Sequence, residues 1–161
     1  MTALCPGSFD PITLGHLDVI RRAHDIFGDV IVAVGRNSTK LNLFSLDERV
    51  ALAGEAVADL PGVRVMPLDG LLARFALDHG ARVLIKGLRF ASEFDYELQM
   101  AHINRAVTGI ETVFLPASAE FGALSSTMLR EVASLGGDVS GFVTPAVGHA
   151  IQAKLAERAS A

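Results

Sequence analysis

The sequence has little of what membrane-spanning, exported or zinc-binding proteins require. Its apolar runs are short, and the longest clean ones, such as VIVAV at 30–34, are far below the ~20 residues of a membrane span. No basic start followed by a long apolar region marks a signal peptide. One cysteine cannot form an internal disulfide, and no Cys/His spacing indicates zinc. The expected location is therefore the cytoplasm, with no membrane as a partner.

Positive charge is also scarce. The formal net charge is −4, which argues against general nucleic-acid binding but leaves room for a local cationic pocket for phosphates. Apolar residues make up 50% of the chain, as in a globular protein rather than a disordered one. The sequence has no internal repeat, low-complexity tract or linker, so we expect residues 1–161 to form a single domain.

What the sequence does contain is a regular alternation of short apolar runs and helix-like segments. The runs expected as strands lie at 2–5, 30–34, 63–66, 82–85 and 112–115. The segments expected as helices lie at 15–27, 45–60, 71–79, 93–107, 125–135 and from 145 onward. Ser45 and Glu48 form an S-x-x-E capping box at the start of the second helix. This pattern predicts an α/β fold, a Rossmann-like single domain with a five-stranded parallel sheet flanked by helices.

Chemistry-bearing residues follow the predicted strands rather than precede them. The carboxyl ends of parallel strands meet at one edge of the sheet, which is where such folds bind ligands. The residues expected at this edge are His16, Lys40, Lys86, Arg89 and the triplet Ser125, Ser126 and Thr127. The turns on the opposite edge are short and carry no such cluster. This asymmetry indicates a phosphate-rich ligand.

The densest turn chemistry lies in PGSFDPITLGH at 6–16, between the first strand and the first helix. Gly15 allows close approach of the backbone to a ligand, and His16 falls in the first helical turn, where free N–H groups favour anions. A histidine placed there can donate to a phosphoryl oxygen as charge builds. The alternative interpretation is a turn with a surface histidine. The other histidines are interpreted as residues of helix faces or ends.

Four blocks of the sequence resemble a known family. PGSFDPITLGH at 6–16 is similar to the (T/S)FDPxxxGH motif of the nucleotidylyltransferase superfamily, and LSSTMLREV at 124–132 is similar to its ISSTxxR signature. KGLR at 86–89 and FDYELQMA at 94–101 bring the resemblance close to the bacterial phosphopantetheine adenylyltransferases, in the family's order and over essentially the whole chain. The resemblance implies transfer of AMP from ATP to 4′-phosphopantetheine, giving dephospho-coenzyme A and pyrophosphate in the penultimate step of coenzyme A synthesis. It implies in-line attack by the acceptor phosphate with Mg²⁺ on the phosphates, and no covalent enzyme intermediate.

The resemblance also implies roles for individual residues. His16 would stabilise the transition state at the α-phosphate of ATP, and Ser8 and Phe9 would lie against phosphate and nucleotide. The residues implied to bind the acceptor are Ser8, Lys40, Leu72 and Lys86. The further residues implied to bind ATP are Gly87, Leu88, Arg89, Glu97, Phe121, Gly122, Ala123, Leu124, Ser125, Ser126 and Thr127. No side-chain metal ligand is expected, because the phosphates would hold most of the Mg²⁺.

Several of these positions have a structural alternative. Lys40 could be a solvated loop lysine, Glu97 a surface charge of a helix, and Leu72 a core residue. The family usually has Arg or Lys at the position of Lys86, and the lysine here lacks the bidentate contact that an arginine offers. One segment departs from the family pattern. FGAL at 121–124 replaces Tyr or Trp followed by Ser-Phe-Ile, which removes a polar aromatic group beside the adenine.

Two other functions remain open from the sequence. One is a nucleotidylyltransferase with another acceptor, such as glycerol phosphate or a nicotinamide nucleotide. The other is a nucleotide-binding regulator without turnover. The intact Gly15-His16 pair and the two lysines favour an enzyme. The resemblance further implies a homohexamer and feedback inhibition by coenzyme A, neither of which composition can show.

Overall fold

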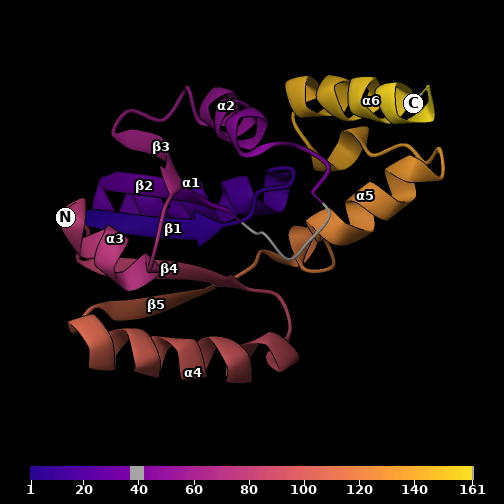
Figure 1. The fold of residues 1–161 in the computed structure, drawn as a ribbon. Helices are drawn as coiled ribbons and strands as arrows, with labels where there is room; N and C mark the ends of the chain where they lie inside the picture. The colour runs from indigo at the N-terminus through magenta and orange to yellow at the C-terminus, as the bar shows by residue number, and fades with distance from the viewer. Residues whose placement is uncertain (37–41, 161) are drawn as a thin grey trace.

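A five-stranded parallel sheet forms the centre of the protein (Figure 1). The structure, a computed structural model, describes residues 1–36 and 42–160, so the expectation for Lys40 lies outside the described residues. The strands are paired in the order β3-β2-β1-β4-β5, every pair parallel. They are β1 (Thr2–Gly7), β2 (Asp29–Gly35), β3 (Val63–Leu68), β4 (Val83–Leu88) and β5 (Glu111–Pro116). The predicted fold class is confirmed.

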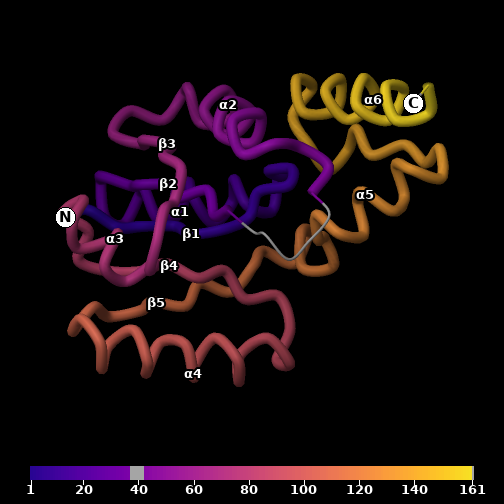
Figure 2. The backbone as a smooth tube through the Cα atoms, viewed as in Figure 1, coloured from indigo at the N-terminus to yellow at the C-terminus, as the bar shows by residue number. Residues whose placement is uncertain are grey.

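Six α-helices connect and extend these strands in the part of the chain that the structure describes. They are α1 (Leu14–Phe27), α2 (Leu46–Ala56), α3 (Leu72–Asp78), α4 (Ala91–Thr108), α5 (Ser126–Ser134) and α6 (Pro145–Ala159). Two short 3₁₀ turns lie at Ala119–Phe121 and Ser140–Phe142. The smooth trace shows α5 and α6 beyond the carboxyl end of β1, far from the N-terminus (Figure 2). No helix within the described ranges is both long and apolar enough to cross a membrane.

The central strands are buried on both faces because alternate side chains point to opposite sides of the sheet. On one face, side chains of β1, β2 and β4 pack with α1, α2, α5 and α6. On the other face, Leu4, Ile31 and Leu84 pack with side chains of α3. Continuous apolar runs such as VIVAV are therefore needed, since neither face of the sheet centre meets water.

Several predicted boundaries differ from the structure by a few residues, most of all at the ends of β4 and α2. The strand expected at 82–85 continues to Leu88, because parallel pairing with β5 extends through Lys86–Phe114 and Leu88–Pro116. Lys86 and Gly87 thus lie within the carboxyl-terminal part of β4 rather than after the strand. The helix expected to reach about residue 60 ends at Ala56. Beyond it, the N–H groups of Ala58 and Leu60 donate to carbonyls three residues earlier instead of four, as in turns. The capping box of Ser45 and Glu48 is confirmed, with both reciprocal hydrogen bonds present.

Candidate active site

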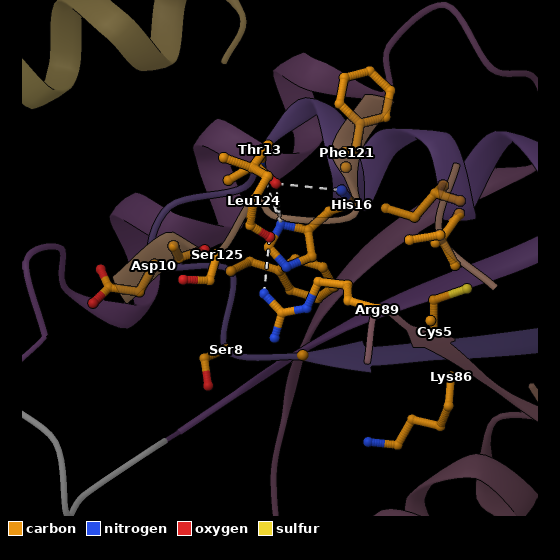
Figure 3. Close-up of a pocket in the computed structure, with 18 of the residues that line it drawn as sticks. Cys5, Ser8, Asp10, Thr13, His16, Lys86, Arg89, Phe121, Leu124 and Ser125 are labelled. Carbon is orange, nitrogen blue, oxygen red and sulfur yellow. Dashed lines mark hydrogen bonds between the residues drawn. The ribbon is translucent and has the colours of Figure 1, made fainter. Parts of the chain in front are cut away.

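A cavity of about 300 Å³ opens at the carboxyl ends of β1 and β4 (Figure 3). The start of α1, the turn after β1 and the segment leading into α5 form its other walls. Its size is at the lower end of the range for small-molecule sites. It lies at the edge of the sheet where the order of strands reverses, since β1 is paired with β2 on one side and β4 on the other. The face predicted to bind a ligand therefore carries a cavity.

His16 lies in the first turn of α1, and Thr13 determines how its ring is held. The Thr13 side chain accepts a hydrogen bond from the His16 backbone N–H at 3.3 Å, and the Thr13 backbone N–H donates to His16 Nδ1 at 3.0 Å. The Thr13 hydroxyl also lies 3.0 Å from Nδ1. Because Nδ1 accepts from an amide, the proton of the neutral ring belongs on Nε2. The imidazole therefore presents Nε2–H as a hydrogen-bond donor.

The His16 ring is neutral at physiological pH. Burial, and secondly the charge of Arg89, lower the pKa of His16 from 6.5 to about 4. The Phe9 ring meets the imidazole edge-on with centroids 5.0 Å apart. Cys5, at the base of the cavity, is no alternative nucleophile, because burial raises the pKa of its thiol to about 12.

Two cations of the β4 end enter the cavity, each held by a carboxylate of α4. The Lys86 ammonium lies 3.1 and 3.0 Å from the two oxygens of Glu97. The Arg89 guanidinium forms a two-point contact with Glu93, four residues along, and donates to the carbonyl of Leu124 at 2.8 Å. Burial raises the pKa of Glu93, but the hydrogen bonds and charge of Arg89 together outweigh it, so the pKa of Glu93 is lowered. The cations are thus partly neutralised without a ligand, and an incoming phosphate would compete with carboxylates for them.

The start of α5 forms the wall opposite β4. Ser125 caps this helix by accepting from the Met128 N–H at 3.1 Å. Ser126 donates its hydroxyl to the carbonyl of Pro11 at 2.8 Å, which ties α5 to the turn after β1. Gly15 lets Phe121 approach the start of α1 closely, since a Cβ at Gly15 would lie only 3.2 Å from Cβ of Phe121. The start of α5, where a helix leaves N–H groups without intrahelical partners, thus lines the cavity through Ser125, Ser126 and Thr127.

Most residues predicted from the sequence lie around this one cavity. Those that line it are Ser8, Phe9, His16, Lys86, Gly87, Arg89, Glu97, Phe121, Leu124, Ser125, Ser126 and Thr127. Leu88, Gly122 and Ala123 lie in the adjoining segments without lining it, and Leu72 begins α3 and packs against the core under that helix. Their individual roles stay predictions.

Thr13, Asp10 and Arg130 are among the lining residues that were not identified from the sequence. Thr13 holds the His16 ring, as described above. Asp10, only 2% exposed, accepts from the backbone N–H groups of Leu43 and Phe44 at 2.9 Å each. Arg130 donates to the carbonyl of Asp10 and lies 3.3 Å from its carboxylate. Asp10 lies in the FDP of the first family motif and Arg130 in the SSTMLR of the second, and membership of these motifs could have identified both residues.

The donor set of the cavity does not form a metal cage. Within residues 1–36 and 42–160, no group of three or more His, Cys, Asp or Glu side chains could hold a metal ion. Asp10 is occupied by two amides and Arg130, and Glu97 by Lys86. Mg²⁺ is commonly bound by substrate phosphates and waters with one or two carboxylates, so its binding does not require a cage of protein ligands.

Comparison with known proteins identifies the family. A family model described as cytidylyltransferase-like matches residues 4–132. A phosphopantetheine adenylyltransferase of Cutibacterium acnes is 54% identical over 151 residues, covering 94% of this chain and 96% of the relative. One from Nocardioides sp. is 51% identical, covering 96% and 97%. One from Acidovorax sp. is 48% identical, covering 99% and 97%.

Solved structures agree on the fold. A putative nicotinate-nucleotide adenylyltransferase from Vibrio parahaemolyticus superposes with a TM-score of 0.71 at 20% identity, covering 96% of this chain and 93% of that chain. A lipopolysaccharide core biosynthesis protein from Thermoplasma volcanium superposes with a TM-score of 0.57 at 22% identity, covering 73% and 96%. At such identities the likeness concerns the fold alone.

Proposed function

The chain belongs to the phosphopantetheine adenylyltransferase family of cytidylyltransferase-like proteins, and we propose that the cavity around His16 is its active site. The enzyme is an adenylyltransferase of coenzyme A biosynthesis. It transfers AMP from ATP to 4′-phosphopantetheine, giving dephospho-coenzyme A and pyrophosphate. An oxygen of the acceptor phosphate attacks the α-phosphorus of ATP, and the bond to the leaving pyrophosphate breaks. The attacking group comes from the substrate, so no covalent enzyme intermediate is needed.

The neutral, oriented imidazole of His16 is the observation that carries this proposal. Its Nδ1 is engaged by Thr13, so Nε2–H is the donor available to the α-phosphate. The α-phosphate gains negative charge on its oxygens during the transfer, and a preorganised donor stabilises that charge more than the ground state. The N-terminus of α1, where His16 lies, adds free N–H groups and the positive end of the helix dipole.

The remaining cavity residues divide between the two substrates in this proposal. Lys86 would bind the acceptor phosphate after exchanging its contact with Glu97, and Arg89 would bind the phosphates of ATP. The first turn of α5, capped by Ser125, would bind further phosphate oxygens or the adenosine part. Two cations at one strand end would bring the acceptor phosphate next to the phosphates of ATP, and in-line attack then requires the attacking and leaving oxygens to lie on opposite sides of the α-phosphorus.

Magnesium is proposed to enter with ATP rather than to occupy a protein site. The contacts of Asp10 and Glu97 support this, because Asp10 accepts from two amides and Glu97 forms an ion pair with Lys86. When bound to the phosphates, Mg²⁺ supplies charge neutralisation on the leaving pyrophosphate. The cavity residues then act on the α-phosphate and the acceptor.

The test of this function is pyrophosphate release with ATP and Mg²⁺, comparing three acceptors. We expect release with 4′-phosphopantetheine and not with glycerol 3-phosphate or nicotinamide mononucleotide. Release with one of the other acceptors alone would keep the reaction type and refute the acceptor. ATP binding without pyrophosphate release with any acceptor would instead indicate a nucleotide-binding regulator without turnover.

We also propose that the protein acts as a homohexamer in the cytoplasm. The family resemblance supports this, as does an apolar face on α4 where Tyr96, Ile103 and Val107 are each more than half exposed. Sedimentation velocity at micromolar concentration measures the assembly directly. A monomer under those conditions would refute the proposal.

Coenzyme A is proposed as an inhibitor of the same site. It shares the pantetheine and adenosine parts with dephospho-coenzyme A, so a cavity that binds both substrates offers contacts to both parts. Inhibition is expected to be competitive with 4′-phosphopantetheine in initial-rate assays. Inhibition unaffected by the acceptor concentration would place coenzyme A elsewhere.

A further inference from the structure

The turn after β1 has an unfavourable backbone at Phe9. Its φ is 47°, the only positive value for a residue other than glycine within residues 1–36 and 42–160. Such a conformation costs of the order of 1–3 kcal/mol and persists only where neighbouring contacts impose it. Phe9 is also 4% exposed, so its ring is enclosed. Contacts on both sides of Phe9 must therefore hold this turn.

One of these contacts comes from a buried arginine of α2. Arg49, in the first turns of α2, is 2% exposed, and its Nη1 donates to the carbonyl of Ser8 at 2.6 Å. The same nitrogen donates to the carbonyl of Gly35 at 2.8 Å. Ser8 follows β1 and Gly35 ends β2, so one guanidinium nitrogen joins the carboxyl ends of two neighbouring strands. On the other side of Phe9, Arg130 donates to the carbonyl of Asp10.

Arg49 differs from Arg130 in its relation to the cavity. Arg130 lines it and is open to a ligand, whereas Arg49 is not among the lining residues. Burial lowers the pKa of Arg49 against the opposing charge of Asp10, and its Nε–H has no hydrogen-bond partner among the described residues. A buried guanidinium whose direct acceptors are two neutral carbonyls is expensive to maintain. Simple packing does not require a charge at this position.

The position of Phe9 reaches His16 directly. The Phe9 ring lies over Gly7, where any side chain would approach it to 2.8 Å, and it meets the His16 ring edge-on. A shift of the Ser8–Phe9 backbone would therefore move both the turn predicted to bind phosphate and the Phe9 ring that packs against the imidazole of His16. A left-handed residue in a turn also brings successive N–H groups to one side, which is the geometry of an anion-binding nest.

We propose that Arg49 is a positioning residue of the active site: it holds the Ser8–Phe9 turn in its left-handed shape for the phosphates of ATP and keeps Phe9 against His16. It does so through the carbonyls of Ser8 and Gly35, without touching substrate. The proposal rests on the cavity being the ATP site, as argued above.

The test compares Arg49→Met and Arg49→Lys with the wild-type enzyme, measuring the Kd for ATP by calorimetry and steady-state kinetics with each substrate varied. We expect Arg49→Met to raise both the Kd and the KM for ATP by about tenfold, the effect of one lost charge-assisted hydrogen bond. Arg49→Lys keeps a charged donor and should return both values to within about threefold of the wild type. Arg21→Met removes a surface arginine paired with Asp59 and should leave both values unchanged.

A purely structural role would give a different result. It would lower the folded fraction and hence the apparent kcat, with the KM and Kd for ATP unchanged, and that outcome overturns the proposal. Should Arg49→Met fail to fold, Arg49→Gln keeps an amide donor without the charge and is judged by the same change in Kd. Wild-type enzyme that binds ATP but releases no pyrophosphate would contradict the proposed reaction, while the Kd comparison would still decide the role of Arg49.

Discussion

Protonation of His16 should oppose folding, because the imidazole is held neutral inside the cavity. Burial and the charge of Arg89 lower its pKa from 6.5 to about 4. Between these two pH values the unfolded chain binds a proton at His16 that the folded protein does not. The free energy of unfolding should therefore fall as the pH falls from 6.5 to 4. Above pH 6.5 the titration of His16 does not affect stability, and below pH 4 the stability lost through His16 stays constant.

The size of this loss follows from the two pKa values. A depression from 6.5 to about 4 corresponds to at most about 3 kcal/mol. His16 keeps part of its surface in contact with solvent, so the measured loss should lie below that limit. A loss of about 2 kcal/mol is nevertheless a large share of the stability of a domain of this size.

The assay is urea denaturation at pH 7.5, 6.5, 5.5 and 4.5 for the wild type and His16→Gln. Glutamine retains an acceptor for the Thr13 N–H but cannot bind a proton. Other titrating groups contribute to both proteins and largely cancel in the difference. The wild type should lose more stability than the variant between pH 6.5 and 4.5. Parallel pH dependences over this range would refute the claim that His16 is held neutral by its surroundings.

Three further predictions test single contacts. Lys86→Met should raise the KM for 4′-phosphopantetheine more than the KM for ATP, because it removes the cation proposed to bind the acceptor. Initial rates with each substrate varied measure both constants, and an equal rise would contradict the assignment. Ser125→Ala removes the cap that accepts from the Met128 N–H and should lower the free energy of unfolding by about 1 kcal/mol. An unchanged free energy of unfolding in a urea titration would disprove this. Leu4→Ala, at a fully buried position of β1, should cost about 2–5 kcal/mol in the same titration, and a loss below about 1 kcal/mol would mean that the core closes around the gap.

The fold could be predicted largely because its signals are local. Apolar runs, the Ser45 capping box and the glycines that end helices act within a few residues, and the structure has a strand or helix at each expected place. The order of the strands could not be derived this way, because β1 is paired with β4 across more than 70 residues of intervening chain. Boundaries were missed where tertiary pairing decides them, as at the end of β4.

The candidate site shows the same division between local and distant contacts. The first-turn position of His16 followed from the turn residues before it, and the structure confirms that placement. The engagement of Lys86 by Glu97 and of Asp10 by Arg130 depends on residues 11 and 120 positions apart, so no spacing rule predicts them. The left-handed Phe9 was also missed, because its backbone is imposed by contacts from elsewhere in the fold rather than by its own residue type.

The central claim is that His16 stabilises the transition state rather than binding the nucleotide. The most direct measurement compares the single-turnover rate and the ATP Kd of His16→Ala with those of the wild type. We expect a rate loss of about 10²–10³-fold, with the Kd for ATP changed by less than about tenfold. A rate and an affinity that fall by the same factor, or a rate that stays near that of the wild type, would contradict it.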